Sequence, residues 1–193
     1  MRIILGSQST RRLEILQAAV GPGHPIEVLP ADIDEQAIRN PNPSALTMAI
    51  ARAKSEAVEL RISGDAVIVT ADTVAVYDHV IREKPRSAGE LRYFVKTYTD
   101  YHVDAVTSVW VHRIKTGWSG TVTDKATVHF RRIGPDLVER IVGDKAFYGS
   151  AGGFLIEHPL MKDRIRFVDG DPDTVQGLPG RLVGLLVRDA LGA

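Results

Sequence analysis

The chain has 193 residues, of which 44% are hydrophobic, and its 24 basic and 24 acidic side chains balance. This balance provides no overall field for nucleic acid or an anionic membrane, so we expect neither partner. The lack of cysteine excludes disulfides, thiolate metal sites and cysteine nucleophiles. No apolar run reaches the length of a membrane span, and the opening one is too short for a signal peptide, which favours a cytoplasmic protein.

The first third of the chain predicts three strands and two helices. The apolar runs and their turn signals place strands at residues 2–5, 26–29 and 66–71, and helices at about 9–19 and 44–60. Ser44 is the expected N-cap of the second helix. The run at 66–71 is apolar throughout, as in a strand buried on both faces, and we expect it to end at Asp72.

The rest of the chain mixes strands and helices without strict alternation. The expected elements are a hairpin over 74–81 that turns at 77–79, a helix over 87–96, strands over about 102–114 and 118–132, a helix over 135–142, a strand over 164–168 and a closing helix over 178–191. This order predicts an α/β fold with a mixed, partly antiparallel sheet. The length fits one domain or two closely joined lobes.

The stretch over residues 3–16 places Ser7, Ser9, Arg11 and Arg12 where a buried strand turns into a helix. A helix N-terminus attracts anions, so arginines in its first turn are ordinarily disfavoured. A bound polyphosphate removes this conflict, because hydroxyls, backbone amides and a guanidinium can all donate to it. The alternative is that Ser9 or its neighbour only caps the helix while the arginines point into water.

Three other features are candidates for chemistry. Asp72 follows a buried strand, where open α/β sheets place ligands, although a carboxylate that accepts turn N–H groups would look the same. Lys84 precedes a proline that restricts it to an extended conformation; an exposed lysine is the alternative. The third is an acidic cluster at 32–35, which fits either the hard oxygen ligands of Mg²⁺ or a solvated loop.

Two classes of site are disfavoured by spacing. The six histidines lack the spacings of zinc motifs, and the glycine-rich stretches match neither a Walker loop nor a dinucleotide fingerprint. Triphosphate chemistry would therefore need another scaffold.

Taken together, the motifs resemble the Maf family of nucleoside triphosphate pyrophosphatases, and they occur in family order over nearly the whole chain. They are Gly6-Ser7-Gln8-Ser9-Thr10-Arg11-Arg12, Ala71-Asp72-Thr73-Val74, Lys84-Pro85, Ala151-Gly152-Gly153-Phe154 with Glu157, and the segment from Gly170 to Pro179. The resemblance implies one Maf-like domain over residues 1–193 with an ITPase-like fold, in which a bent mixed sheet is flanked by helices and two lobes enclose a central cleft. It also implies a homodimer.

The chain departs from the family pattern at three positions. Thr10 replaces a proline in the Ser-Pro-Arg-Arg loop, and Ser150 stands where a lysine or cysteine is common, which puts a substrate contact there in doubt. Glu157 occupies the position of a glutamine in the branch that resembles dTTP and UTP pyrophosphatases. The run from 151 to 157 looks more like the branch that prefers 7-methyl-GTP.

The resemblance implies hydrolysis between the α and β phosphates, giving a nucleoside monophosphate and pyrophosphate. It assigns Asp72 and Glu35 to the base for water and to the ligand of a divalent metal, Mg²⁺ or else Mn²⁺ or Co²⁺, with their roles exchangeable. The other expected roles are phosphate binding by Ser7, Ser9, Arg11 and Arg12, charge neutralisation by Lys54 and Lys84, and base recognition or a second metal at Glu157. A regulator of cell division that binds nucleotide without turnover, and an ITP or XTP pyrophosphatase, are the alternatives.

Overall fold

The computed structural model describes residues 1–99 and 102–192. The chain forms two compact units. The first contains Met1–Asp72, Thr107–Asp124 and the chain from Gly177 onward, and the second contains Thr73–Val106 and Lys125–Gln176.

Seven strands of the described residues form one mixed sheet in the order β2-β1-β3-β5-β6-β7, with β4 paired to β3. The strands are β1 (Arg2–Leu5), β2 (Ile26–Val28), β3 (Ala66–Tyr77), β4 (Val80–Arg82), β5 (Val103–Arg113), β6 (Trp118–Phe130) and β7 (Ile165–Asp169). β1 runs parallel to β2 and β3, whereas the β3–β4 and β6–β7 pairs are antiparallel. The predicted α/β class with a mixed sheet and helices is confirmed.

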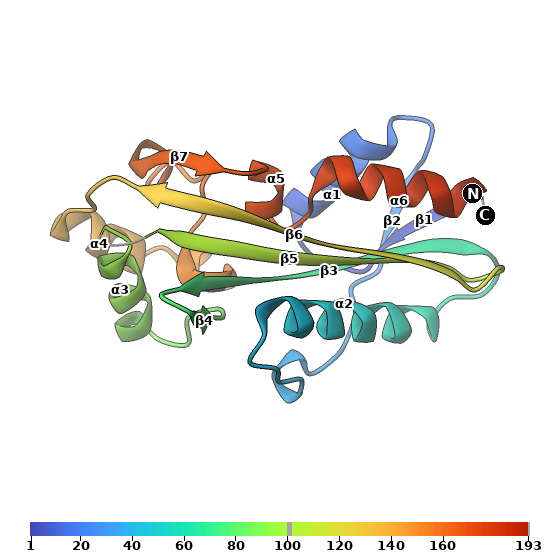
Figure 1. Cartoon of the computed structure of the whole chain (residues 1–193), viewed down its shortest axis with the longest axis horizontal. Helices are drawn as coiled ribbons and strands as arrows, with labels where there is room; N and C mark the ends of the chain where they lie inside the picture. Colours follow the sequence, from blue (N-terminus) through green and yellow to red (C-terminus); the bar gives the residue numbers. More distant parts are fainter. Residues whose placement is uncertain (100–101, 193) are drawn as a thin grey trace. The chain divides into compact units, whose positions relative to one another are not determined.

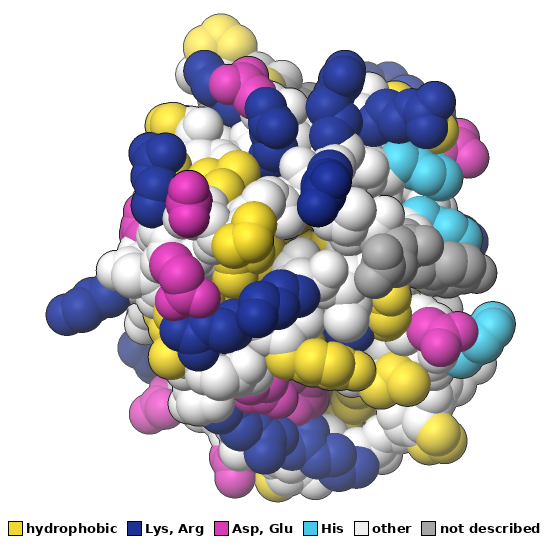
Figure 2. Space-filling view, turned by 90° about the vertical axis from the view of Figure 1, so that its left-hand side faces the viewer, with side chains coloured by type: hydrophobic (Ala, Val, Ile, Leu, Met, Phe, Trp, Pro, Cys, Tyr) yellow, Lys and Arg dark blue, Asp and Glu magenta, His cyan; other side chains and the backbone are white. Residues whose placement is uncertain are grey.

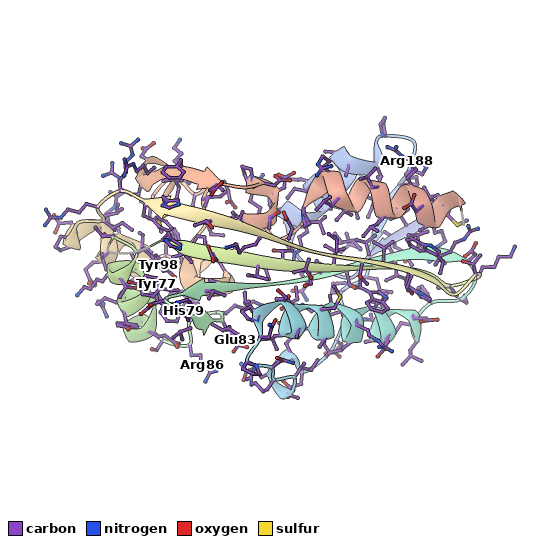
Figure 3. The ribbon with its side chains drawn as sticks, in the orientation of Figure 1. Tyr77, His79, Glu83, Arg86, Tyr98 and Arg188 are labelled. Carbon is purple, nitrogen blue, oxygen red and sulfur yellow. The ribbon has the colours of Figure 1, made fainter. Side chains whose placement is uncertain are left out.

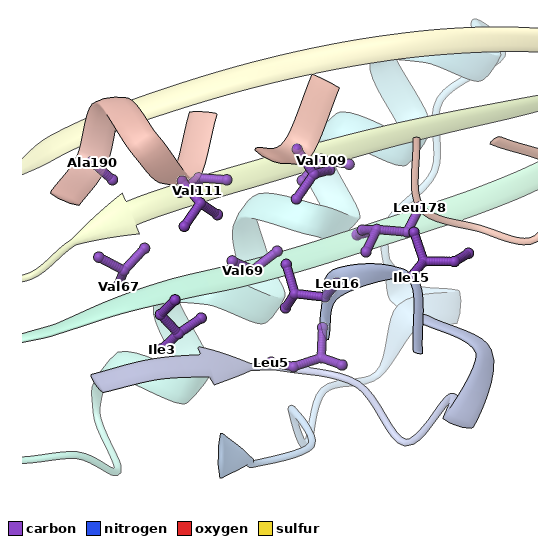
Figure 4. Packing of buried hydrophobic residues seen from close by; sticks show 13 residues of the cluster. Ile3, Leu5, Ile15, Leu16, Val67, Val69, Val109, Val111, Leu178 and Ala190 are labelled. Atoms are coloured by element: carbon purple, nitrogen blue, oxygen red, sulfur yellow. The ribbon is translucent and has the colours of Figure 1, made fainter. Parts of the chain in front are cut away.

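In the first unit, helices cover both faces of the parallel strands (Figure 1). Helices α1 (Thr10–Val20) and α6 (Gly180–Gly192) lie together on one face, and α2 (Pro43–Glu59) lies on the other. Figure 4 shows the core on the α1 and α6 side, where Val67 and Val69 of β3 belong to one buried cluster with Leu16 of α1. Since strand side chains alternate between faces, Ile68, Thr70 and Asp72 of β3 point toward α2.

The second unit holds α3 (Ala88–Thr97), α4 (Pro135–Val142) and the short α5 (Pro172–Val175). Its core is rich in aromatic side chains, with Tyr98, Phe147 and Phe154 all buried. Short 3₁₀ turns occupy Lys145–Gly149 and Ala151–Gly153. The glycine-rich stretch over residues 149–153 therefore forms compact turns packed on this core.

Two element boundaries were predicted wrongly. The strand expected to end at Asp72 continues to Tyr77, because the buried carboxylate has a cationic partner and does not interrupt the strand. Helix α2 begins at Pro43 rather than at Ser44, and its N-cap is Asn42, whose side chain accepts from the Ala45 N–H. Proline suits this first helical position because its missing N–H would have no intrahelical acceptor.

The predicted hairpin is confirmed, with its turn at Asp78 and His79. Both residues have positive φ angles, 47° and 64°, as two-residue turns that match strand twist require. No helix among the described residues is long and apolar enough to cross a membrane. Figure 2 shows one face of the molecule, on which Lys and Arg side chains are interspersed with acidic and hydrophobic ones.

Candidate active site

Three charged side chains meet in the first unit at the α2 face of β3. The Lys54 ammonium lies 2.9 Å from Asp72 Oδ1 and 2.8 Å from Glu35 Oε1. Helix α2 supplies the lysine, β3 supplies Asp72, and Glu35 begins a single 3₁₀ turn after β2. The side chains of Lys54 and Asp72 are about one-tenth exposed, whereas that of Glu35 is 38% exposed. Two carboxylates thus share one buried cation, with Glu35 on the solvent side.

Arg12 adds a second cation to this unit. Its Nε donates to the Gly177 carbonyl at 2.8 Å, and its Nη1 donates to the Ala71 carbonyl at 3.0 Å. The Ala71 carbonyl also accepts from Lys54 at 3.4 Å, so both cations are held by the backbone next to Asp72. Gly177 has a φ of 97°, and a Cβ there would lie 2.8 Å from Arg12 Nε, so this position requires glycine.

Burial and charge oppose each other at Asp72 and Arg12. Burial raises the pKa of Asp72 above its usual 3.8, while Lys54 and Arg12 act to lower it and Glu35 raises it further. Burial likewise lowers the pKa of Arg12, and the charges of Asp72 and Glu35 counteract this shift. A carboxylate whose pKa is raised in this way binds a proton more readily, which is the property of a general base.

The loop before α1 is organised by its two serines. Ser9 is the N-cap, and its Oγ accepts from the Arg12 N–H at 3.3 Å. Ser7 is buried, and its Oγ accepts from the Ser9 N–H at 3.2 Å. Arg11 pairs with Glu14 at 2.7 Å on the surface of the helix. Ser9 therefore caps the helix, but only one of the two arginines lies on the surface as the capping alternative expected, because Arg12 instead binds the Ala71 and Gly177 carbonyls next to Asp72.

The donor set of the first unit suits a hard divalent cation. Asp72 and Glu35 both direct oxygen atoms at the same point, which Lys54 Nζ occupies. No group of three or more metal-ligating side chains occurs in the described part of the chain. Mg²⁺ is commonly held by one or two carboxylates together with substrate phosphates. The two carboxylates therefore fit a metal that the substrate helps to bind.

The second unit contains the other two predicted site residues, Lys84 and Glu157, and both side chains are exposed. Lys84 lies between Glu83, whose carbonyl accepts from the Gly152 N–H at 3.0 Å, and the buried Pro85. Glu157 follows the turn that contains Gly152. The same glycine turn is thus bonded to the residue before Lys84 and precedes Glu157.

Sequence reasoning missed two contributors to the first unit. Both act through backbone carbonyls, those of Ala71 and Gly177, which bind Arg12. A carbonyl leaves no residue-type signal, although the glycine itself stands in the predicted motif from 170 to 179.

Known proteins resemble the chain over nearly its full length. Residues 2–190 match the family model described as Maf-like protein. A 7-methyl-GTP pyrophosphatase from Dictyostelium discoideum is 35% identical, with 96% of this chain and 95% of that protein covered. A dTTP/UTP pyrophosphatase from Pyrococcus abyssi is 32% identical, with the same two shares covered. The crystal structure of protein VC0702 from Vibrio cholerae is 16% identical, with a TM-score of 0.44 and with 98% of this chain and 97% of that one covered. The family match and the two curated relatives place this chain in the Maf-like protein family.

Proposed function

We propose that this protein is a nucleoside triphosphate pyrophosphatase that cleaves between the α and β phosphates of a modified or non-canonical nucleotide. Membership of the Maf-like family supports this activity, as do relatives named 7-methyl-GTP pyrophosphatase and dTTP/UTP pyrophosphatase. The observation that carries the proposal is the ion-pair group in which buried Lys54 joins Asp72 to the more exposed Glu35, beside which Arg12 is anchored.

In this reaction, a water oxygen attacks the α phosphorus and the bond to the bridging oxygen of the β phosphate breaks. Pyrophosphate leaves, and the nucleoside monophosphate gains the hydroxyl. Asp72 accepts the proton of the water, as the raised pKa of its carboxyl favours. Phosphoryl transfer depends mainly on positioning and charge stabilisation, so Arg12 and Lys54 contribute by neutralising phosphate oxygens.

A divalent cation completes the proposed site, with Mg²⁺ first and Mn²⁺ or Co²⁺ next. Glu35 and Asp72 would hold it, since they are the carboxylates that converge on one point. When bound, the ion neutralises charge on the phosphate oxygens. Glu35 is the more exposed of the two, so it is the carboxylate better placed to exchange Lys54 for another cation.

The remaining assignments concern the phosphates and the base. Ser7, Ser9 and Arg11 are proposed phosphate contacts, and Lys84 is proposed to neutralise phosphate charge. Glu157 is proposed to face the base, where a carboxylate accepts from the N1–H and exocyclic amine of guanine and suits the cationic ring of a 7-methylated one. The 35% identity to a 7-methyl-GTP pyrophosphatase supports this preference.

The deciding experiment is a substrate panel with product identification. Purified protein is assayed with 7-methyl-GTP, dTTP, UTP, ITP and XTP under Mg²⁺, Mn²⁺ and Co²⁺. We expect monophosphate and pyrophosphate, with 7-methyl-GTP hydrolysed best. Release of inorganic phosphate instead, or binding without turnover, would contradict the proposal, and the latter would favour the regulator of cell division.

Two further proposals concern the protein in the cell. We infer that the protein is a homodimer, on the resemblance to the family, and that it lies in the cytoplasm, as the sequence favours. Light scattering of the purified protein measures the first, and fractionation of cells measures the second.

A further inference from the structure

The second unit contains a buried hydroxyl that the proposed reaction does not use. Tyr98 is the C-cap residue of α3, its side chain is 1% exposed, and its hydroxyl donates to the carbonyl of Gly152. Burial raises the pKa of this tyrosine, so the hydroxyl keeps its proton and remains a donor. The hydroxyl is therefore protonated at neutral pH, where it can donate to the carbonyl.

Three aromatic contacts fix the ring that carries this hydroxyl. Tyr98 stacks on Phe130 with ring centroids 5.1 Å apart, and it meets Phe154 edge to face at 5.6 Å. Tyr77 lies on another side at 6.1 Å, and Figure 3 labels both tyrosines next to each other. A ring held from several directions has little rotational freedom, so its hydroxyl defines one position for the bonded carbonyl.

Gly152 connects Tyr98 to the segment that contains Lys84, because its backbone forms a hydrogen bond with each of them. Its carbonyl accepts from Tyr98, and its N–H donates to the Glu83 carbonyl at 3.0 Å. Gly152 has a φ of 68°, and a Cβ there would lie 2.9 Å from the Tyr98 hydroxyl oxygen and 2.6 Å from Ala75 Cβ. The close approach that makes the hydrogen bond thus also requires glycine at this position.

Buried residues also hold the chain before and after Lys84. Pro85 is buried, and a Cβ at Gly153 would lie 3.3 Å from its Cγ, so the glycine turn also packs on the residue after the lysine. Arg82 is buried, and it donates to Thr97 Oγ1 at 2.8 Å. Lys84 itself is exposed, whereas the backbone on either side of it is held through the Glu83 carbonyl and the buried Pro85.

We propose that Tyr98 is a positioning residue, which sets the backbone position of Lys84 through Gly152 and Glu83. The inference rests on the proposed function, in which Lys84 neutralises phosphate charge. Displacing a charged group by a fraction of an ångström weakens its effect on the transition state while leaving the fold intact. The hydroxyl of Tyr98 thus contributes to the reaction without touching substrate.

The test is a double-mutant cycle that combines Tyr98→Phe with Lys84→Ala, because such a cycle measures the coupling of two residues directly. Tyr98→Phe keeps the ring and removes the hydroxyl. We expect it to lower kcat/KM by about tenfold in the wild-type background and by less than about twofold when Lys84 is alanine. The matched control is Tyr77→Phe, whose hydroxyl donates to the Thr97 carbonyl at 3.0 Å, away from the glycine turn. This control should change kcat/KM by less than about twofold.

A second measurement does not depend on activity. Hydrogen exchange of the Gly152 amide and of residues 150–154 should be faster in Tyr98→Phe than in Tyr77→Phe. Unchanged exchange would overturn the inference, as would equal losses of kcat/KM in both Lys84 backgrounds. A Tyr98→Phe protein that fails to fold, beside a folded Tyr77→Phe, would make Tyr98 a structural residue only. Full activity of Lys84→Ala, by contrast, would remove Lys84 from the proposed function itself.

Discussion

The two units each bury a cation, and they stabilise it by different means. Lys54 of the first unit contacts the carboxylates of Asp72 and Glu35 at 2.9 and 2.8 Å. Arg82 of the second unit lies over the rings of Tyr77 at 3.9 Å and Phe94 at 4.7 Å. Its hydrogen bonds go to neutral groups, the Thr97 hydroxyl and the Phe94 carbonyl. Both side chains are almost fully buried.

The partners of the two cations decide whether each group can take part in a reaction. Carboxylates can take up a proton, bind a metal or release their cation when a phosphate arrives, so the Lys54 group can take part in a reaction. Aromatic rings, a threonine hydroxyl and a single backbone carbonyl do not take up a proton at neutral pH, so we expect the Arg82 group to hold β4 to the end of α3. Breaking each group should therefore affect different properties.

The largest effect is expected for Asp72→Asn. The substitution keeps the shape of the side chain but removes the charge that accepts the proton of water. We expect kcat to fall by at least about 100-fold while circular dichroism stays that of the wild type. The measurement is steady-state turnover of the best substrate, and near-normal activity of the folded variant would exclude Asp72 as the base.

Arg82→Ala should act on stability. It removes a desolvated cation–π group, worth about 2 kcal/mol, together with the packing of the side-chain stem. We expect the free energy of unfolding, measured with urea, to fall by about 3 kcal/mol. A decrease below about 1 kcal/mol would show that the contacts between the guanidinium and the rings contribute little to stability.

The two arginines of the N-terminal loop offer a sharper comparison within one unit. Arg12→Ala should weaken binding of a non-hydrolysable triphosphate analogue by about 1.5–3 kcal/mol, because it removes a part-buried charge held beside Asp72. Arg11→Ala should weaken it by less, since Arg11 pairs with Glu14 on the surface. Calorimetry measures both affinities, and equal losses would place both guanidinium groups on the phosphates.

Glu157→Gln tests selectivity. A glutamine offers a donor where the carboxylate only accepts, so the preference for 7-methyl-GTP over dTTP and UTP should narrow by about tenfold, which is about 1.4 kcal/mol. The measurement is kcat/KM for all three nucleotides in both proteins. A uniform decrease would instead indicate that Glu157 positions water or a metal, and a wild type that favours dTTP would contradict the base-reading role.

The smallest effect concerns pH, because the comparison of Asp72→Asn with wild type isolates the pKa shift of one carboxyl group. The pKa of Asp72 is raised in the folded state above 3.8, so the folded protein holds this proton more tightly than the unfolded chain does. The resulting stability is fully present below pH 3.8 and is lost as the pH rises through the folded-state pKa. The free energy of unfolding of Asp72→Asn, relative to wild type, should therefore increase over that window. A difference in unfolding free energy that stays constant with pH would show that burial does not shift the pKa of Asp72.

Much of the architecture followed from residue pattern alone. The strand at 2–5, the hairpin that turns after Tyr77, and the helix that opens at Pro135 all lie where period, turn residues and caps predicted them. These signals are local, because they depend on a few neighbouring residues and on the backbone angles that those residues allow. The wrong boundaries at Asp72 and Ser44 arose where a distant or competing partner decided the outcome.

The candidate site shows the same contrast between local sequence signals and contacts of distant residues. The sequence by itself determined which residue types are present: an acidic pair, a helix lysine, two arginines and a glycine-rich turn, in the order of the Maf-like family. Only the tertiary structure decided that Lys54 joins Glu35 to Asp72, and that Arg12 rather than Arg11 turns toward them. It also decided that Tyr98 reaches Gly152. These contacts join residues 18 to 165 positions apart, whose approach depends on packing of the whole sheet and its helices, and no local pattern encodes it.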